Sequence, residues 1–201
     1  MLKKYFVLLI ILTISLFSLS GCYDIKNIDD LAYVIALGID VGSKNDLKLT
    51  FQIAKPTKSG AESSESSGGD SGFIINTVEC SSIDSGFNLI NSFASKEINL
   101  SHCRVIVISE ELAEKDISEY IYTLMNKVQI RPSTNIIVSK CSAEYYLRQS
   151  KPSLDKIAAK YYDITNTAKE YTGYTDDVTL NQFFSSLRDN RGEPYAILGR
   201  C

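Results

Sequence analysis

The stretch LAYVIALGID, from Leu31 to Asp40, decides the fold of this 201-residue chain. Only its glycine and its final aspartate are not hydrophobic, and many of its side chains are branched. The run is too short to span a membrane, and its lack of polar alternation is typical of a strand that is covered on both faces. We therefore predict a strand over Leu31–Asp40 that is covered on both of its faces.

The segments that follow predict two further strands and a long loop. Residues 42–46 are rich in turn-forming types, and Leu47–Ile53 then alternates between apolar and polar side chains. This alternation predicts a second strand that forms an antiparallel hairpin with the first. Residues 55–72 are mostly serine, glycine and glutamate, a composition that cannot bury a core and predicts a flexible loop. Phe73–Cys80 then resumes a strand pattern.

Two helices are predicted next, because apolar residues recur at helical spacing. The first covers Ile83–Ala94 and follows Ser81–Ser82 as possible caps. The second covers Glu114–Val128, where Asp116 and Glu119 have the spacing of an N-cap and an N3 residue. Its apolar stripe consists of Ile117, Ile121, Leu124 and Val128.

Buried-strand patterns over Cys103–Ser109 and Asn135–Lys140 alternate with these helices. The tail is helical in character, with a cap at Ser142, a proline at a helix start at Pro152 and a capping box at Thr179. The sequence therefore predicts an α+β fold: a mixed β-sheet of about five strands, helices packed on it, and a helical C-terminal segment.

The first 22 residues have the three parts of a lipoprotein signal peptide. Lys3 and Lys4 form a basic start, Tyr5–Leu19 is an apolar run, and small residues end at Gly21 before Cys22. We predict that residues 1–21 are the signal peptide, that cleavage occurs between Gly21 and Cys22, and that the Cys22 thiol accepts a diacylglyceryl group. Fatty acyl chains such as palmitate would then hold the mature chain on a membrane. An uncleaved membrane anchor is the alternative.

The charge balance argues against several classes of partner. The whole chain has a formal net charge of −3, and removal of residues 1–21 leaves 19 basic and 24 acidic side chains. Neither a basic stripe for nucleic acid nor a polybasic patch for anionic lipid is evident, so no nucleic-acid partner is expected and membrane attachment depends on the lipid. About 180 mature residues suffice for one domain, which we place at residues 22–201.

The cysteines do not form a metal or redox motif. After Cys22, four cysteines remain at wide spacing without a C-x-x-C pair: Cys80, Cys103, Cys141 and Cys201. The first three lie at the edges of strand-like runs, and we expect them to act as small buried apolar residues. Disulfide formation after export is the alternative.

Catalytic chemistry is poorly represented, so no catalytic, metal-ligating or cofactor-binding residue is predicted. His102 is the single histidine, and it could form a dyad with Cys103 only if neighbouring strand side chains pointed the same way, which they do not. A cysteine-dependent enzyme is therefore disfavoured. The acid pairs Glu110–Glu111 and Asp176–Asp177 fit solvated ends or caps.

Several segments together resemble the Ger(x)C lipoproteins, the C subunits of nutrient germinant receptors in bacterial spores. In order, they are Gly21–Asp24, Asn27–Asp40, Ser101–Ala113, Ile130–Pro132, Lys140–Glu144 and Tyr174–Leu180. Family members usually carry tryptophan after the lipid cysteine, where this chain has Tyr23, and they continue with further α/β domains. The chain therefore resembles the N-terminal domain alone, with the later family domains absent.

The resemblance implies a non-enzymatic subunit that is anchored by its lipid to the outer face of the spore inner membrane. It implies assembly with two integral membrane subunits, A and B, into a receptor that responds to amino acids, sugars or nucleosides. The subunit would act as a scaffold or interaction subunit. The alternative is a surface lipoprotein that itself binds a small nutrient ligand, which would need a cleft with converging polar groups.

Overall fold

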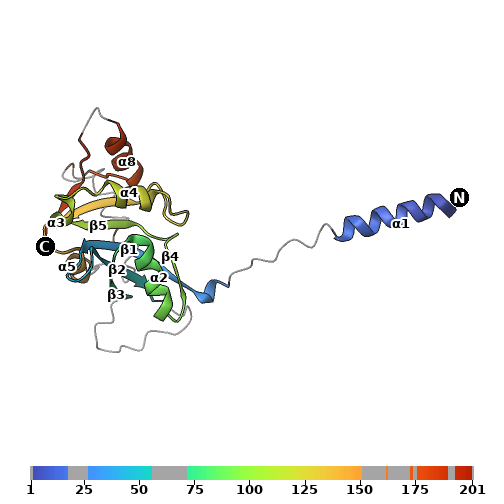
Figure 1. Cartoon of the computed structure of the whole chain (residues 1–201), viewed down its shortest axis with the longest axis horizontal. Helices are drawn as coiled ribbons and strands as arrows, with labels where there is room; N and C mark the ends of the chain where they lie inside the picture. Colours follow the sequence, from blue (N-terminus) through green and yellow to red (C-terminus); the bar gives the residue numbers. More distant parts are fainter. Residues whose placement is uncertain are drawn as a thin grey trace. The chain divides into compact units, whose positions relative to one another are not determined.

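The computed structural model describes residues 2–17, 27–55, 72–150, 162, 173, 176–189 and 193–200. The chain divides into two compact units, Met1–Asp30 and Leu31–Cys201. The first unit contains helix α1 (Leu2–Phe17) and a short 3-10 turn at Ile28–Asp30. The second unit contains the sheet and the other labelled helices, which are seen in Figure 1.

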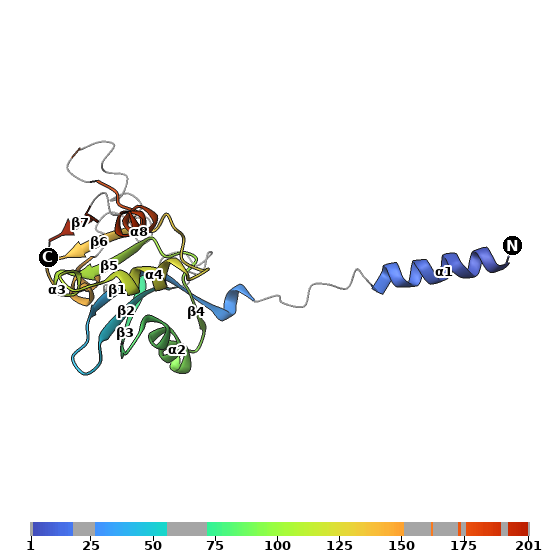
Figure 2. The same ribbon diagram turned by 45° about the horizontal axis from the view of Figure 1, so that its top comes forward.

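The described part of the second unit contains a seven-stranded mixed sheet. Its order is β3-β2-β1-β5-β6-β7, and β4 pairs with β1 beside this path (Figure 2). The three strands β3, β2 and β1 are antiparallel neighbours, whereas β4, β5, β6 and β7 run parallel to β1. Their bounds are β1 (Leu31–Val41), β2 (Leu47–Ala54), β3 (Phe73–Cys80), β4 (Glu97–Asn99), β5 (Val105–Ser109), β6 (Asn135–Ser139) and β7 (Ile197–Gly199).

Strand β1 lies in the interior of this sheet, and both of its faces are covered, as its sequence predicts. One edge pairs with β2, and the other edge pairs first with β4 and then with β5. A β-bulge interrupts the pairing with β2 between Val34 and Ala36. As a result, Ile35 and Ala36 both belong to the same core cluster. The Arg104 amide, just before β5, donates a 2.8 Å hydrogen bond to the Ile35 carbonyl.

Helices cover both faces of the sheet. One face carries the larger core and packs against α2 (Ile83–Phe93), α4 (Ser118–Met125) and α8 (Leu180–Arg188). The other face packs against α5 (Ala143–Gln149) and the buried side chain of Tyr162. The short helix α3 (Glu110–Ala113) directly follows the end of β5. The α+β class with a mixed sheet is therefore confirmed.

Helix α2 forms where the sequence predicts it, and Ser82 is its N-cap. The Ser82 and Ser85 side chains form a reciprocal capping box, which satisfies two amide groups at the helix start. Phe87 of this helix packs edge-on against Phe51 of β2, with ring centroids 5.4 Å apart. Gly86 is buried against Leu49 and Cys80, and its lack of a side chain allows the helix to lie close to the sheet.

The predicted helix over residues 114–128 is wrong at both ends. The structure divides this region into α3 and α4, and α4 begins at Ser118. The Asp116 carboxylate accepts a 3.0 Å hydrogen bond from the Ser118 amide, but Ile117 occupies the N-cap position. Val128 lies beyond the end of α4 and is fully exposed, so it does not continue the buried stripe of Ile121 and Leu124.

The sheet has more strands than the roughly five predicted from the sequence. Strands β4 and β7 contain three residues each, too few to produce a readable alternation. The capped helices predicted after Ser142 and Thr179 are confirmed as α5 and α8, although the C-terminal segment also supplies β7. The helix expected at Pro152 and almost all of the loop expected at residues 55–72 lie outside the described residues.

Substitution of Gly86 by alanine tests the close contact between α2 and the sheet. A Cβ at this position would lie 2.5 Å from Leu49 Cδ1 and 2.8 Å from Cys80 Sγ, so the buried neighbours would have to move. We expect Gly86→Ala to lower the free energy of unfolding by about 1–3 kcal/mol in urea denaturation, despite the higher helix propensity of alanine. Asn88→Ala, on the exposed side of the same helix, is the control and should change stability little. An equally stable Gly86→Ala variant would contradict the close packing.

Candidate functional site

The predicted lipid attachment residues, Gly21 and Cys22, lie outside the described residues. Helix α1 covers most of the predicted apolar part of the leader, and its described side chains are exposed. Within the described part of the chain, the helices fall short of the length and apolar character that crossing a membrane requires. The cleavage and lipidation assigned to these residues therefore remain predictions.

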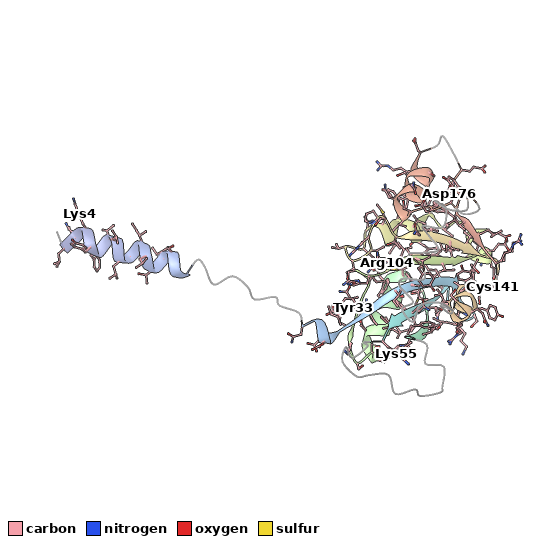
Figure 3. All side chains as sticks on the ribbon, turned by 180° about the vertical axis from the view of Figure 1, so that it is seen from behind. Lys4, Tyr33, Lys55, Arg104, Cys141 and Asp176 are labelled. Carbon is pink, nitrogen blue, oxygen red and sulfur yellow. The ribbon has the colours of Figure 1, made fainter. Side chains whose placement is uncertain are left out.

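The second unit begins at the amino end of the parallel strands. Leu31 of β1 pairs with Glu97 at the start of β4. Nearby, the rings of Tyr33 and His102 meet edge-on with centroids 4.6 Å apart. Figure 3 shows Tyr33 and Cys141 at opposite ends of the sheet, with Cys141 at the carboxyl end of the parallel strands.

The carboxyl ends of three parallel strands form a row of polar residues. Ile39 pairs with Ile108 and Ser109 pairs with Ser139, so the register places Asp40, Ser109 and Ser139 side by side. All three are buried. In open α/β sheets, ligands bind outside the carboxyl ends of the strands, often at the N-terminus of a helix. This end of the sheet is therefore the candidate functional site.

The N-terminus of α5 is occupied by a carboxylate of the chain itself. Asp40 Oδ1 accepts a 2.6 Å hydrogen bond from the Ala143 amide, and Oδ2 accepts a 3.0 Å hydrogen bond from the Glu144 amide. The Ser142 hydroxyl caps the next amide, that of Tyr145, at 3.2 Å. Asp40 thus takes the place that an anionic ligand would take at the N-terminus of a helix.

Charged residues surround this contact on the solvent side. The Lys48 ammonium lies 3.1 Å from a Glu144 oxygen, and Arg148 contacts the other oxygen at 2.9 Å. Burial raises the pKa of Asp40, although hydrogen bonds from the Glu144 and Ala143 amides and the charge of Lys48 oppose this shift. Burial also raises the pKa of Glu144, but hydrogen bonds from Lys48 and Arg148 outweigh it and lower the value. The arrangement resembles a structural cap with an ion-pair rim.

His102 and Cys103 do not form a catalytic dyad. His102 is exposed, whereas Cys103 is buried and its Sγ lies 3.4 Å from the Val105 carbonyl oxygen. Burial raises the pKa of Cys103 to about 12, so the thiolate needed for nucleophilic attack is not formed near neutral pH. Cys80 is likewise a buried free thiol whose pKa is raised by burial. Both cysteines therefore act as the small buried apolar residues that the sequence predicts.

The prediction for Cys141 is wrong. This residue follows the end of β6, is only partly buried and is disulfide-bonded, so it is not a buried free thiol. Its sulfur lies 3.3 Å from the Ser139 hydroxyl. The bonded partner lies outside the described residues, because Cys80 and Cys103 are both free.

The acid pairs lie at the surface. Glu110–Glu111 is exposed in the first turn of α3, and Asp176 is exposed, with its carboxylate accepting a hydrogen bond from the Asp177 amide. In the part of the chain that the structure describes, no group of three or more histidine, cysteine or acidic side chains could hold a metal ion. These acid pairs therefore do not belong to a metal-binding cluster among the described residues.

Sequence reasoning missed the role of Asp40. The only available signal was an aspartate at the end of an otherwise apolar strand, and its helix partner lies more than 100 residues further along the chain. The Ser142 cap was readable, but its spatial relation to β1 was not. The sequence therefore gave no indication of the helix that Asp40 contacts.

Comparison with known proteins gives a family match over nearly the whole second unit. Residues 24–199 match the family described as "Spore germination protein N-terminal domain". The chain is 27% identical to YfkR of Bacillus subtilis (strain 168), a protein named for spore germination, over 180 residues that cover 89% of this chain and 45% of that protein.

Two other relatives come from the same organism. The chain is 24% identical to spore germination protein KC, over 96% of this chain and 49% of that protein. It is 23% identical to spore germination protein B3, over 92% of this chain and 46% of that protein. The chain spans about half the length of these curated relatives. No solved structure matches the chain significantly.

Removal of the Asp40 carboxylate tests its contact with α5. In Asp40→Ala, the Ala143 and Glu144 amides lose their buried acceptors, so we expect the free energy of unfolding to fall by about 2–4 kcal/mol. Asp40→Asn keeps one acceptor oxygen and should lose less. Glu111→Ala, at an exposed acid, is the control and should change stability by less than about 0.5 kcal/mol. Urea denaturation of the three variants measures these differences; a wild-type value for Asp40→Ala would contradict the proposed cap.

The raised pKa of Asp40 predicts a particular pH dependence of stability. The folded chain keeps the Asp40 proton to a higher pH than the unfolded chain, because burial disfavours the carboxylate. The resulting stabilisation is complete below the ordinary pKa of aspartate and is lost as the pH rises through the raised value. The stability of wild type relative to Asp40→Asn should therefore fall as the pH rises from below the ordinary pKa of aspartate through the raised pKa of Asp40. A relative stability that rises over this range would show that the pKa is lowered instead.

Proposed function

Because the chain belongs to the family of spore germination protein N-terminal domains, we propose that it acts in germination as a lipid-anchored subunit of a nutrient germinant receptor. One observation carries this proposal. The family match begins at Asp24, two residues after the predicted lipid attachment site Cys22, and it extends to Gly199. The family domain thus starts where a mature lipoprotein would start.

The proposed anchor is a diacylglyceryl group on Cys22, formed after export, with the signal peptide then removed after Gly21. Two acyl chains hold a protein on a bilayer much more firmly than one. Eight residues lie between Cys22 and Leu31, the first residue of β1, and the nine fully extended steps from one to the other reach at most about 32 Å. The lipid would therefore keep the sheet domain close to the outer face of the spore inner membrane.

The proposed role within the receptor is that of a non-enzymatic scaffold that contacts integral membrane A and B subunits. Two features of the described residues support a scaffold over ligand capture. Asp40 occupies the N-terminus of α5, the position where a parallel sheet commonly binds an anionic ligand. Strand β3 and strand β7 end the sheet path on either side, and strand edges offer backbone groups to a partner. Buried, protonated Cys103 also supports a role without nucleophilic catalysis.

Replacement of Cys22 tests the anchor directly. We expect Cys22→Ala to incorporate no labelled palmitate, to lose the lipid-modified mature mass in intact-mass spectrometry, and to lower germination in response to nutrients. Ser20→Ala is the matched control, because it keeps a small residue before the cleavage position and should be labelled like the wild type. Native protein with an unmodified Cys22 and an attached leader would overturn the anchoring step.

Calorimetry separates scaffolding from ligand capture. The full chain in detergent, titrated with amino acids, sugars or nucleosides, should give no saturable heat if the chain is a scaffold. Co-purification with integral membrane subunits should be retained under the same conditions. Saturable heat without any membrane subunit present would instead favour a nutrient-binding lipoprotein.

A further inference from the structure

The disulfide at Cys141 has a small set of possible partners. The chain has five cysteines, and Cys80 and Cys103 are buried free thiols. Cys141 is disulfide-bonded, so its partner within the chain is either Cys22 or Cys201. Cys22 carries the lipid in the function proposed above, and the choice between the two rests on that proposal in part.

The strand register gives an independent reason to choose Cys201. Ser139 of β6 pairs with Gly199 of β7, and the Lys140 amide donates a 3.1 Å hydrogen bond to the Gly199 carbonyl. Cys141 is two residues beyond Ser139, and Cys201 is two residues beyond Gly199. Neighbouring strands lie about 4.8 Å apart, within the Cα separation that a disulfide requires. We propose that Cys141 is joined to Cys201 and that this disulfide fixes the edge strand β7 to the sheet.

Strand β7 is a short edge strand that such a constraint would stabilise. It has three residues, pairs with β6 as its one neighbour among the described strands, and leaves Leu198 about half exposed. Tyr146 of α5 packs against it at Gly199, where an added Cβ would lie 2.8 Å from the ring. A disulfide between Cys141 and Cys201 would close a loop of 59 intervening residues and restrict the unfolded chain accordingly.

The bond can form by thiol–disulfide exchange after export. The thiolate of one cysteine attacks a disulfide of an oxidised dithiol oxidoreductase, which gives a mixed disulfide, and the second cysteine then displaces the carrier thiol. The chain loses two thiol hydrogens and gains one S–S bond, while the carrier disulfide is reduced to a dithiol. Cys141 is partly accessible at the end of β6, unlike the buried Cys80 and Cys103. Accessibility therefore selects Cys141 for this exchange.

Mass spectrometry of the full native chain tests the pairing. The chain is extracted from membranes with free thiols blocked and is cleaved after lysine without reduction. The five cysteines then lie on separate fragments, with Cys201 on the fragment that begins at residue 170 and Cys141 on the fragment that begins at residue 141. We expect these two fragments to be joined, and to separate on reduction.

The other outcomes are distinguishable from failure of the anchor. The proposed disulfide would be overturned by a link from Cys141 to Cys80 or Cys103, or by blocked thiols at both Cys141 and Cys201. If the Cys22 fragment carries a lipid in that experiment, the proposed receptor function is not affected. A link from Cys141 to Cys22 would overturn both proposals. A lipid-free Cys22 fragment beside an intact link from Cys141 to Cys201 would overturn only the anchor.

Hydrogen exchange tests the effect on β7. In Cys141→Ser and in Cys201→Ser, protection of the Ile197–Gly199 amides should fall roughly tenfold or more. The double variant should match each single variant, because both remove the same bond. Reductant should lower protection in the wild type and have no effect on the double variant. Unchanged protection in the single variants would show that the bond does not hold β7.

Discussion

The sheet depends on the hydrogen bonding of β1 along both of its edges. Strand β2 pairs with one edge, and β4 and β5 divide the other edge between them, so the strand joins the antiparallel and parallel halves. Both of its faces are covered as well, which explains why its sequence is almost entirely apolar. An ionisable residue in such a strand must find partners within the protein. Asp40 finds them in the first amides of α5, and the strand therefore also fixes the helix that covers the smaller core.

Elements with a strong local pattern could be predicted from the sequence, and elements whose existence depends on the sheet could not. Alternation predicted β2, serine caps predicted the start of α2, and a capping-box spacing predicted the start of α8, because all three signals arise from neighbouring residues. Strands β4 and β7 carry no such signal at three residues each, and they exist because longer strands offer them an edge. The break between α3 and α4 could not be predicted from the sequence either. Ala113, Ile117 and Ile121 keep the four-residue spacing of a helix, but the backbone at Ile117 is not helical.

In the candidate site, too, local sequence patterns predicted some features and could not predict others. The separation of His102 and Cys103 follows from strand alternation, so local reasoning excluded the dyad correctly. The contact between Asp40 and α5 joins residues 103 and 104 positions apart, and no local pattern specifies it. Cys141 was mistaken for a core thiol because strand-edge cysteines in an apolar run resemble one another in sequence. Only the strand end at Ser139 shows that Cys141 lies beyond the core.

At the carboxyl end of the parallel strands, Asp40 occupies the N-terminus of α5, and this contact opposes the binding of an anionic ligand there. Parallel sheets that bind nucleotides leave a helix N-terminus free and approach the ligand with glycine-rich backbone. Here the corresponding helix is short, its first amides bind Asp40 and Ser142, and Lys48 pairs with Glu144 at the rim. A ligand at this position would have to displace the buried Asp40 carboxylate, which accepts hydrogen bonds from two amides.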